Sequence, residues 1–273
     1  MSPDFVHQEL RDLDIELTPA QLDQLDRYLA LVLDENRTTN LTAVREPDAA
    51  WRRLIIDSLT VLPGLDELEP GSKVIDVGSG AGLPGMPVAI ARPNLSVTLL
   101  ESTGKKASFI QRAIDTLGLT NATVLQERAE TIGQSPKHRE QYDACINRAV
   151  GPMNVLLEFA LPLVTVGGRV LAMKGPKVEE ELGDAGDALS ILGAGDLAVI
   201  DAYPESFGND LVIVSIIKES PTPDEYPRLP GVPKKQPLRA TQGARRYISR
   251  FARDAARRPL NTPMIPAAPT IAL

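Results

Sequence analysis

The first part of the chain has apolar residues at the spacing of two amphipathic helices. Thr18 and Pro19 have the form of a helix N-cap followed by proline at the first helical position. Apolar residues then recur three or four positions apart, at Leu22, Leu25, Leu29, Val32 and Leu33. This spacing predicts a helix over residues 19–35. A second apolar face begins at Pro47 and runs through Trp51, Leu54, Ile55, Leu59 and Leu62. We therefore expect a helical N-terminal cap over residues 1–65.

From Gly71 onward, strand patterns alternate with helix patterns. The predicted strands cover residues 73–77, 96–101, 122–126, 142–147, 169–174, 197–202 and 211–218. The predicted helices begin at Pro84 and cover residues 105–117, 153–164 and 178–192. Such alternation is typical of a parallel sheet with helices on both faces. A short loop joins the last two strands, so we expect them to be antiparallel. The predicted fold class is α/β, with a seven-stranded, Rossmann-like, mostly parallel sheet and an antiparallel last strand.

A glycine-rich segment follows the first predicted strand, with Gly78, Gly80 and Gly82 at alternate positions. Glycine tolerates positive φ and carries no Cβ, so a ligand can lie against the main chain there. The first N–H groups of the following helix point at such a ligand. Asp76 stands two residues before the first glycine, where a carboxylate can meet the cationic methionine part of S-adenosylmethionine. A dinucleotide pyrophosphate would be repelled by it. The segment therefore predicts S-adenosylmethionine as the cofactor.

Two other functions remain open for the same segment. Residues 80–85 also fit the G-x-G-x-x-G pattern of dinucleotide folds, which indicates a nicotinamide-dependent oxidoreductase as one alternative. That enzyme lacks an evident proton donor, because neither His7 nor His138 follows a predicted strand. The other alternative is a non-enzymatic RNA-binding assembly factor that has kept the fold. The intact acids at Asp76 and Glu101 argue against it.

Acidic residues also follow the second and third predicted strands. Glu101 ends the second strand about twenty residues beyond the glycines, where an acid can accept hydrogen bonds from both ribose hydroxyls. Ala129 and Glu130 follow the third strand, and we expect them to flank the adenine, with Ala129 leaving room for its ring. Because the carboxyl ends of parallel strands meet at one edge of a sheet, these residues are expected to share a cofactor site.

The fourth predicted strand ends in Asn147-Arg148-Ala149. It lacks the Asp/Asn-Pro-Pro-aromatic turn that usually accompanies methylation of exocyclic amino groups. Carbon methylation of pyrimidines needs a cysteine nucleophile, but Cys145 lies inside the strand pattern, where a buried, inert thiol is expected. Guanine N7 has a lone pair and no proton, so it can attack a sulfonium methyl group without a general base. Catalysis would then consist of positioning and electrostatics.

Two cations stand where that positioning is needed. The guanidinium of Arg148 can hold a phosphate or the edge of a base, and the alternative is an ion pair with a neighbouring carboxylate. Lys174 ends the fifth strand at the same edge of the sheet, where it can contact RNA phosphate or simply solvate the strand end.

Composition and charge narrow the class of protein. The 273 residues are 43% hydrophobic and 24% charged, which is typical of an ordinary soluble protein, and one α/β domain with additions is the simplest organisation. The chain has no long apolar stretch and no signal-peptide pattern at its start, so we expect a cytoplasmic protein without membrane attachment. The single cysteine excludes an internal disulfide and a cysteine cluster for zinc, and no metal is expected. The net charge of -7 argues against indiscriminate coating of nucleic acid but allows a local basic face.

The C-terminal part differs in composition. Residues 239–273 contain seven arginines against one acid, Asp254. Tyr247, Ile248 and Phe251 can form one stripe of a short basic helix, so an RNA-binding arm and a solvated tail both remain open. We therefore divide the chain into four parts. They are the helical cap (1–65), the cofactor-binding domain (66–220), a Pro/Lys-rich segment (221–238) and the Arg-rich tail (239–273).

Several short motifs together resemble one known family. They are Asn40-Leu41-Thr42, Asp57-Ser58-Leu59, Asp76-Val77-Gly78-Ser79-Gly80-Ala81-Gly82-Leu83-Pro84-Gly85, Leu99-Leu100-Glu101-Ser102, Arg128-Ala129-Glu130, Asn147-Arg148-Ala149-Val150, Met173-Lys174-Gly175 and Tyr226-Pro227-Arg228 with Pro237-Leu238. From residue 20 to residue 238 the chain resembles the glucose-inhibited division protein B family. The resemblance implies a class I methyltransferase fold and a bacterial enzyme that methylates N7 of one guanine in the decoding-region loop of small-subunit ribosomal RNA. The implied partner is that RNA or an assembling 30S particle, and we expect the chain to be a monomer.

The resemblance also implies roles for particular residues. The cofactor-binding positions of the family fall on Gly78, Leu83, Ala129, Glu130 and Arg148, with Glu101, Ser102 and Thr103 nearby. The motif positions that face RNA or the cofactor pocket fall on Asn40, Arg128 and Lys174. One position departs from the family. Many members carry histidine three residues before Asp57, whereas this chain has Leu54 there, preceded by Arg52 and Arg53. If that histidine contacts substrate in the relatives, an arginine can substitute for it here.

Overall fold

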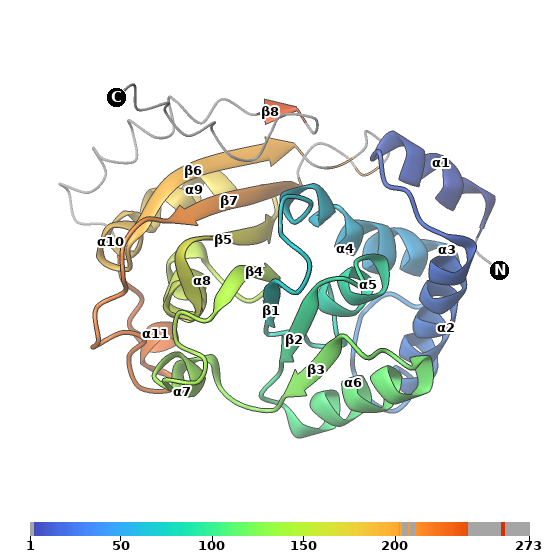
Figure 1. Cartoon of the computed structure of the whole chain (residues 1–273), viewed down its shortest axis with the longest axis horizontal. Helices are drawn as coiled ribbons and strands as arrows, with labels where there is room; N and C mark the ends of the chain where they lie inside the picture. The colour runs from blue at the N-terminus through green and yellow to red at the C-terminus, as the bar shows by residue number, and fades with distance from the viewer. Residues whose placement is uncertain (1–2, 202, 204–206, 208–210, 240–257, 260–273) are drawn as a thin grey trace.

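The computed structural model describes residues 3–201, 203, 207, 211–239 and 258–259, and it is built around one mixed sheet (Figure 1). Its strands are β1 (Lys73–Val77), β2 (Ser96–Leu100), β3 (Ala122–Leu125), β4 (Tyr142–Arg148), β5 (Val164–Lys174), β6 (Ala194–Asp201), β7 (Val212–Lys218) and the two-residue β8 (Arg258–Pro259). The strand order is β3-β2-β1-β4-β5-β7-β6-β8. Strand β7 is antiparallel to both β5 and β6. The predicted α/β fold is confirmed, and β8, which lies in the tail, is an addition that the sequence did not predict.

The order of the strands determines where a ligand can bind. Strand β1 lies at the centre of the sheet, between β2 and β4, and is parallel to both. The chain runs outward from β1 to β3 on one side and then returns to β4 on the other. In open α/β sheets the crevice at this reversal, at the carboxyl ends of the strands, is the usual ligand site. The segments that follow β1 and β4 therefore lie where a ligand is expected to bind.

The N-terminal region is helical, as predicted. Its elements are α1 (Asp4–Asp12), α2 (Pro19–Glu35), α3 (Pro47–Ala50), the π-helix η1 (Trp51–Ile56), α4 (Asp57–Leu59) and the 3₁₀ turn η2 (Leu62–Gly64). A capping box begins α2, with the Gln21 N–H donating to Thr18 Oγ1 at 3.2 Å and the Thr18 N–H donating to Gln21 Oε1 at 2.8 Å. The helix predicted from Pro47 is present but passes through a π-helical turn, a feature that often marks a functional site.

Helices cover both faces of the sheet (Figure 1). The remaining helical elements are α5 (Gly85–Ala91), α6 (Gly104–Leu117), α7 (Ala129–Gly133), α8 (Met153–Ala160), η3 (Leu161–Leu163), α9 (Val178–Asp184), α10 (Gly186–Ile191) and α11 (Val232–Lys235). One apolar cluster joins the N-terminal helices to α5, α6 and one face of the sheet. A second cluster joins α8, α9 and α10 to the other face. The cap therefore shares a core with the sheet. The single helix predicted over residues 178–192 is divided into α9 and α10.

The Pro/Lys-rich segment packs against the fold. The Arg139 guanidinium donates to the carbonyl oxygens of Thr222 and Tyr226, both at 2.6 Å. Arg228 pairs with the fully buried Glu158 at 2.6 Å. Residues 240–257 and 260–273, which include the predicted basic helix around Tyr247, Ile248 and Phe251, lie outside the described residues. In the part of the chain that is described, no helix is long and apolar enough to cross a membrane.

Candidate active site

Two cavities open at the carboxyl edge of the sheet, on either side of the end of β4. The large cavity has a volume of about 890 Å³, and Arg148 and Ala149 are among the residues that line it. The small cavity has a volume of about 80 Å³ and includes Gly78 and Val150 in its lining. Consecutive residues at the end of β4 therefore line both cavities, with Arg148 and Ala149 at the large one and Val150 at the small one.

The three predicted glycines share a left-handed backbone conformation, but Gly78 and Gly82 are needed for different structural reasons. All have positive φ, at +75° for Gly78, +61° for Gly80 and +94° for Gly82. A Cβ on Gly82 would lie 2.6 Å from Met86 Cγ and 3.2 Å from the hydroxyl of Tyr28, which donates to the Ala81 carbonyl at 2.7 Å. Gly82 is thus required by the packing of α2 onto the loop. Gly78 is exposed, and its bare backbone lines the small cavity.

Three residues that were predicted to bind the cofactor lie beneath the lining of the small cavity. Gly82 and Leu83 are buried, and neither lines either cavity. Asp76 is fully buried, and its Oδ2 accepts a hydrogen bond from the Gly85 N–H at 2.9 Å. Its Oδ1 has no partner among the described residues. Burial raises the pKa of Asp76 to about 7, although the Gly85 N–H opposes that rise. Asp76 supports the loop from beneath, and its predicted contact with the methionine part of the cofactor stays a prediction.

Glu101 connects the glycine loop to the turn after β2. It is 7% exposed and lines the small cavity. Its Oε2 accepts from the Gly80 N–H at 2.9 Å, and its Oε1 accepts from the Thr103 N–H at 2.7 Å. Each carboxylate oxygen keeps a second lone pair, so the predicted hydrogen bonds to ribose hydroxyls remain available. Ser102 also lines the small cavity, whereas Thr103 contributes only its N–H to Glu101.

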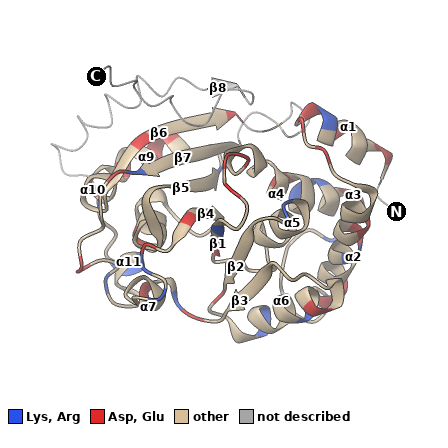
Figure 2. Cartoon of the chain, in the orientation of Figure 1, with Lys and Arg blue, Asp and Glu red and all other residues tan. Residues whose placement is uncertain are grey.

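The far wall of the small cavity comes from α7 and from the C-terminal segment. Ala129 and Glu130, which were predicted to flank the adenine, line the cavity, and so does the exposed Arg128. Their contact with adenine stays a prediction. Glu130 Oε1 accepts from the Gly231 N–H at 2.9 Å. Lys234 of α11 lines the same cavity, with its ammonium 6.0 Å from the centre of the Phe159 ring, and Figure 2 shows the basic residues of α11 in blue. The sequence did not predict that the C-terminal segment contributes to this wall, because its composition carried no signal for the contact.

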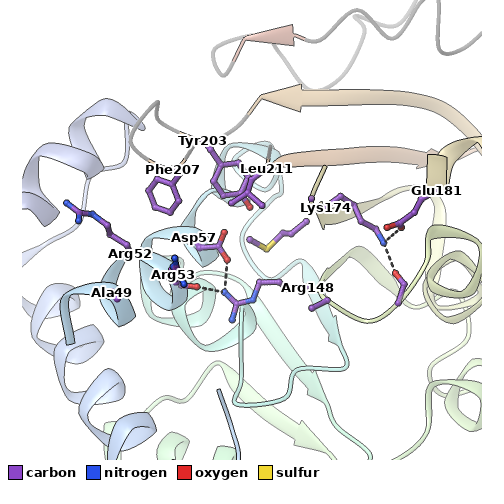
Figure 3. Close-up of a pocket in the computed structure, with 14 residues that line it drawn as sticks. Ala49, Arg52, Arg53, Asp57, Arg148, Lys174, Glu181, Tyr203, Phe207 and Leu211 are labelled. Carbon is purple, nitrogen blue, oxygen red and sulfur yellow. Dashed lines mark hydrogen bonds and ion pairs between the residues drawn. The ribbon is translucent and has the colours of Figure 1, made fainter. Parts of the chain in front are cut away.

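Arg148 is held in a fixed position at the large cavity (Figure 3). Its Nη1 donates to Asp57 Oδ2 at 2.6 Å and to the Arg53 carbonyl at 3.0 Å. The predicted alternative, an ion pair, is therefore present. Among the described residues, the N–H groups of Nε and Nη2 have no partner and remain for a substrate. The ion pair fixes the orientation of the guanidinium without using all its donors.

The other two residues predicted to be catalytic are placed differently. Lys174 lines the large cavity but is 9% exposed, and its Nζ contacts Glu181 Oε2 and the Gly151 carbonyl, each at 2.7 Å. Glu181 neutralises the charge that was expected to meet RNA phosphate. Asn40 is exposed and lines neither cavity, so the structure does not bring it together with Arg148.

The position that departs from the family lies at the π-helix. Leu54 is 4% exposed and belongs to the core, so it cannot take the place of a histidine that contacts substrate. Arg52 and Arg53 both line the large cavity. Arg52 pairs with Glu9 at 2.7 Å and lies 4.0 Å above the ring of Phe5. The exposed Arg53 side chain has no partner within the described residues, and Arg53 lies beside Arg148 at the large cavity (Figure 3).

Comparison with known proteins identifies the family. The family model for GidB, described as rRNA small subunit methyltransferase G, matches residues 21–205. The chain belongs to this family. A relative from Moorella thermoacetica, named ribosomal RNA small subunit methyltransferase G, is 42% identical over 84% of this chain and 95% of its own length. A relative of the same name from Chloroflexus aggregans is 42% identical over 82% of this chain and 93% of its own length. The predicted family, its enzyme class and its cofactor, S-adenosylmethionine, are confirmed.

Similarity to solved structures is weaker. A putative S-adenosyl-L-methionine-dependent methyltransferase from Methanococcus maripaludis matches 63% of this chain and 90% of its own, at 13% identity and a TM-score of 0.49. Within the described residues, no group of three or more His, Cys, Asp or Glu side chains is arranged to hold a metal ion.

Proposed function

We propose that this protein transfers the methyl group of S-adenosylmethionine to N7 of a guanine in 16S ribosomal RNA. The single observation that carries the proposal is the arrangement around the end of β4. A bare-backbone cavity lies on one side of it, and a cavity with a fixed guanidinium lies on the other. A methyl donor in the first and a base in the second would meet at residues 148–150. Membership of a family of ribosomal RNA methyltransferases supports the same assignment.

The residues around the small cavity fit the adenosine part of the cofactor. A Cβ on Gly78 would lie 3.1 Å from Val150 Cγ2, so glycine keeps this approach to the main chain open. Glu101 offers carboxylate lone pairs for ribose hydroxyls, and Ala129 offers a small side chain beside an adenine ring. We assign Gly78, Glu101, Ser102, Ala129 and Glu130 to this binding surface, with Gly80, Gly82, Leu83, Asp76 and Thr103 supporting it from beneath or beside it.

The chemistry needs no general base. When bound, S-adenosylmethionine supplies a methyl group whose bond to sulfur breaks as the bond to N7 forms, while the electron pair stays on sulfur. N7 loses no proton, so the task of the protein is to hold the base and to stabilise charge. The ion pair with Asp57 holds the Arg148 guanidinium at the large cavity, which supports this role for it. The thiol of Cys145 is fully buried within β4, and burial raises its pKa, so it is not a nucleophile.

The charges at the large cavity suit an RNA substrate. Four cations line it, Arg52, Arg53, Arg148 and Lys174, against the two carboxylates of Asp57 and Glu181. Lys174, Arg148 and Arg52 are each paired with an acid, which leaves Arg53 as the cation for RNA phosphate. A local cationic rim on a chain of net charge -7 favours a defined site over coating of nucleic acid. We propose that the chain acts as a cytoplasmic monomer, on free small-subunit RNA or on an assembling 30S particle.

The experiment that tests the proposal uses small-subunit RNA and 30S particles that lack the modification. Incubation with methyl-labelled S-adenosylmethionine should place label on guanine N7, identified by nuclease digestion and mass spectrometry. Arg53→Gln should raise the KM for RNA and leave kcat unchanged. The control is Val166→Ala, an exposed position near the amino end of β5, which should change neither quantity. Label found only on protein or small molecules would defeat the proposal.

A ligand test separates the alternatives. A ligand that binds only the folded state raises the melting temperature. We expect S-adenosylhomocysteine to raise it and nicotinamide dinucleotides to leave it unchanged. The opposite result would favour the oxidoreductase, and RNA binding without any effect of S-adenosylhomocysteine would favour the assembly factor.

A further inference from the structure

The large cavity has an aromatic wall, formed by Tyr203 and Phe207 between β6 and β7. Their ring centres are 5.7 Å apart and their planes are inclined by 52°. Both side chains are partly exposed and both line the cavity, although aromatic residues make up only 4% of the chain. Figure 3 shows the aromatic wall across the cavity from Arg148, with Asp57 between them. Nothing in the reaction or in the cofactor site described above uses these two rings.

We propose that the aromatic wall is the binding site of the target base, a guanine that is flipped out of its RNA loop and stacked on Phe207 and Tyr203. This inference rests on the proposed function. Unpaired RNA bases are commonly held by stacking on aromatic side chains, and enzymes that modify a base take it out of its stack into a pocket. Stacking leaves the edge of the base free, so N7 can face the strand end at residues 148–150.

The cofactor assignment and the charges place the base in the large cavity. The adenosine part of the cofactor is assigned to the small cavity, which leaves the large cavity of about 890 Å³ for the target nucleotide. The small cavity is also lined by three carboxylates, those of Glu101, Glu127 and Glu130, against two cations, Arg128 and Lys234. This excess of acids suits hydroxyl groups better than a phosphate-bearing nucleotide. Arg53 lines the large cavity and is exposed, so it can contact the phosphate of the same nucleotide.

The aromatic wall also suits the charge of the product. A guanine that has accepted a methyl group at N7 carries a positive charge, because its lone pair has formed the new bond. The faces of aromatic rings attract cations, and the attraction strengthens where water is excluded. The carboxylate of Asp57 lies on the same side of the cavity and is shared with Arg148. Burial raises the pKa of Tyr203, so its ring remains a neutral phenol. The aromatic wall therefore favours the transition state, in which this charge develops, over the neutral base.

Two measurements test whether the aromatic wall binds the target base, and one of them does not depend on turnover. The first is calorimetric titration of the protein, saturated with S-adenosylhomocysteine, with guanosine monophosphate and with 7-methylguanosine monophosphate. We expect the methylated nucleotide to bind more tightly, and Phe207→Leu to abolish this preference. The second is methyl transfer to unmodified 30S particles. We expect Phe207→Leu to lower kcat/KM about tenfold, the typical worth of one base-aromatic stack, and Phe207→Tyr to restore most of it.

The controls keep the outcomes distinct. Val166→Ala, which lies outside both cavities, should behave as the wild type in both measurements. The affinity for S-adenosylhomocysteine should be the same in all variants, which also shows that they fold. Equal binding of the two nucleotides, or unchanged kcat/KM in Phe207→Leu, would show that the aromatic wall does not bind the target base. The methyltransferase assignment would still stand. A wild-type protein that methylates no RNA would instead overturn the proposed function, and with it the base-binding role of the aromatic wall.

Discussion

Gly78→Ala tests whether the cofactor lies against the bare main chain after β1. Gly78 has φ of +75°, a left-handed conformation that costs an alanine about 1–2 kcal/mol. The loss of chain entropy in the unfolded state offsets about 0.4–1 kcal/mol of this cost. The added Cβ would lie 3.1 Å from Val150 Cγ2, a contact that a small shift of the valine relieves. We therefore expect the free energy of unfolding to fall by about 1 kcal/mol, or about 2–4 °C in melting temperature.

The effect on binding should be much larger than the effect on stability. The new methyl group would occupy the face of the small cavity on which the ligand is proposed to lie, so we expect affinity for S-adenosylhomocysteine to fall at least tenfold, about 1.4 kcal/mol. Gly118→Ala is the matched control. Gly118 has φ of +67° at the end of α6, has no atom within 4 Å of an added Cβ and lines neither cavity. It should lose similar stability and keep full affinity.

Calorimetric titration and thermal denaturation of both variants separate the two effects. If Gly78→Ala binds S-adenosylhomocysteine as tightly as Gly118→Ala does, the ligand does not lie against this part of the chain. The assignment of the small cavity would then be refuted, whatever the change in melting temperature.

Three further perturbations test the site and its support. Arg148→Ala should lower the kcat of methyl transfer about a hundredfold, the typical worth of one fixed electrostatic donor, with a melting curve that still shows a folded protein; an unchanged kcat would remove Arg148 from the mechanism. The folded pKa of Asp76, about 7, lies above its ordinary value of 3.8. The folded protein therefore binds a proton that the unfolded chain has released, so the free energy of unfolding should fall as pH rises from about 4 to about 7. Asp76→Asn should flatten this fall in urea denaturation, and parallel curves for the two proteins would contradict the burial argument. Arg228→Ala leaves the fully buried Glu158 unpaired and should cost about 3–5 kcal/mol of stability, which a second substitution, Glu158→Gln, should partly restore; no recovery in the double variant would show that the charge is not the cause.

The local rules of the sequence predicted the elements that depend on neighbouring residues. The capping box and the apolar spacing of α2 lie within one continuous segment, as does the glycine loop between β1 and α5. The strand ends at Glu101 and Arg148 followed from the topology of the sheet, because parallel strands bring their carboxyl ends to one edge. These parts of the site could therefore be predicted before the structure was known.

The parts that were missed depend on contacts between distant segments. The neutralisation of Lys174 by Glu181 depends on how α9 packs behind β5. Arg53 reaches the large cavity because η1 is a π-helix, and no sequence spacing distinguishes that turn from an ordinary helix. Lys234 reaches the small cavity because the C-terminal segment folds back along α7 and α8. Phe207 does not follow directly after a predicted strand, so the sequence carries no signal that it lines the large cavity.

The most direct test of the account is a crystal structure of the full chain with S-adenosylhomocysteine. The account predicts adenosine density in the small cavity, against Gly78 and beside Ala129, with the sulfur atom directed past Val150 toward Arg148. An empty small cavity, or a ligand bound elsewhere on the protein, would contradict it.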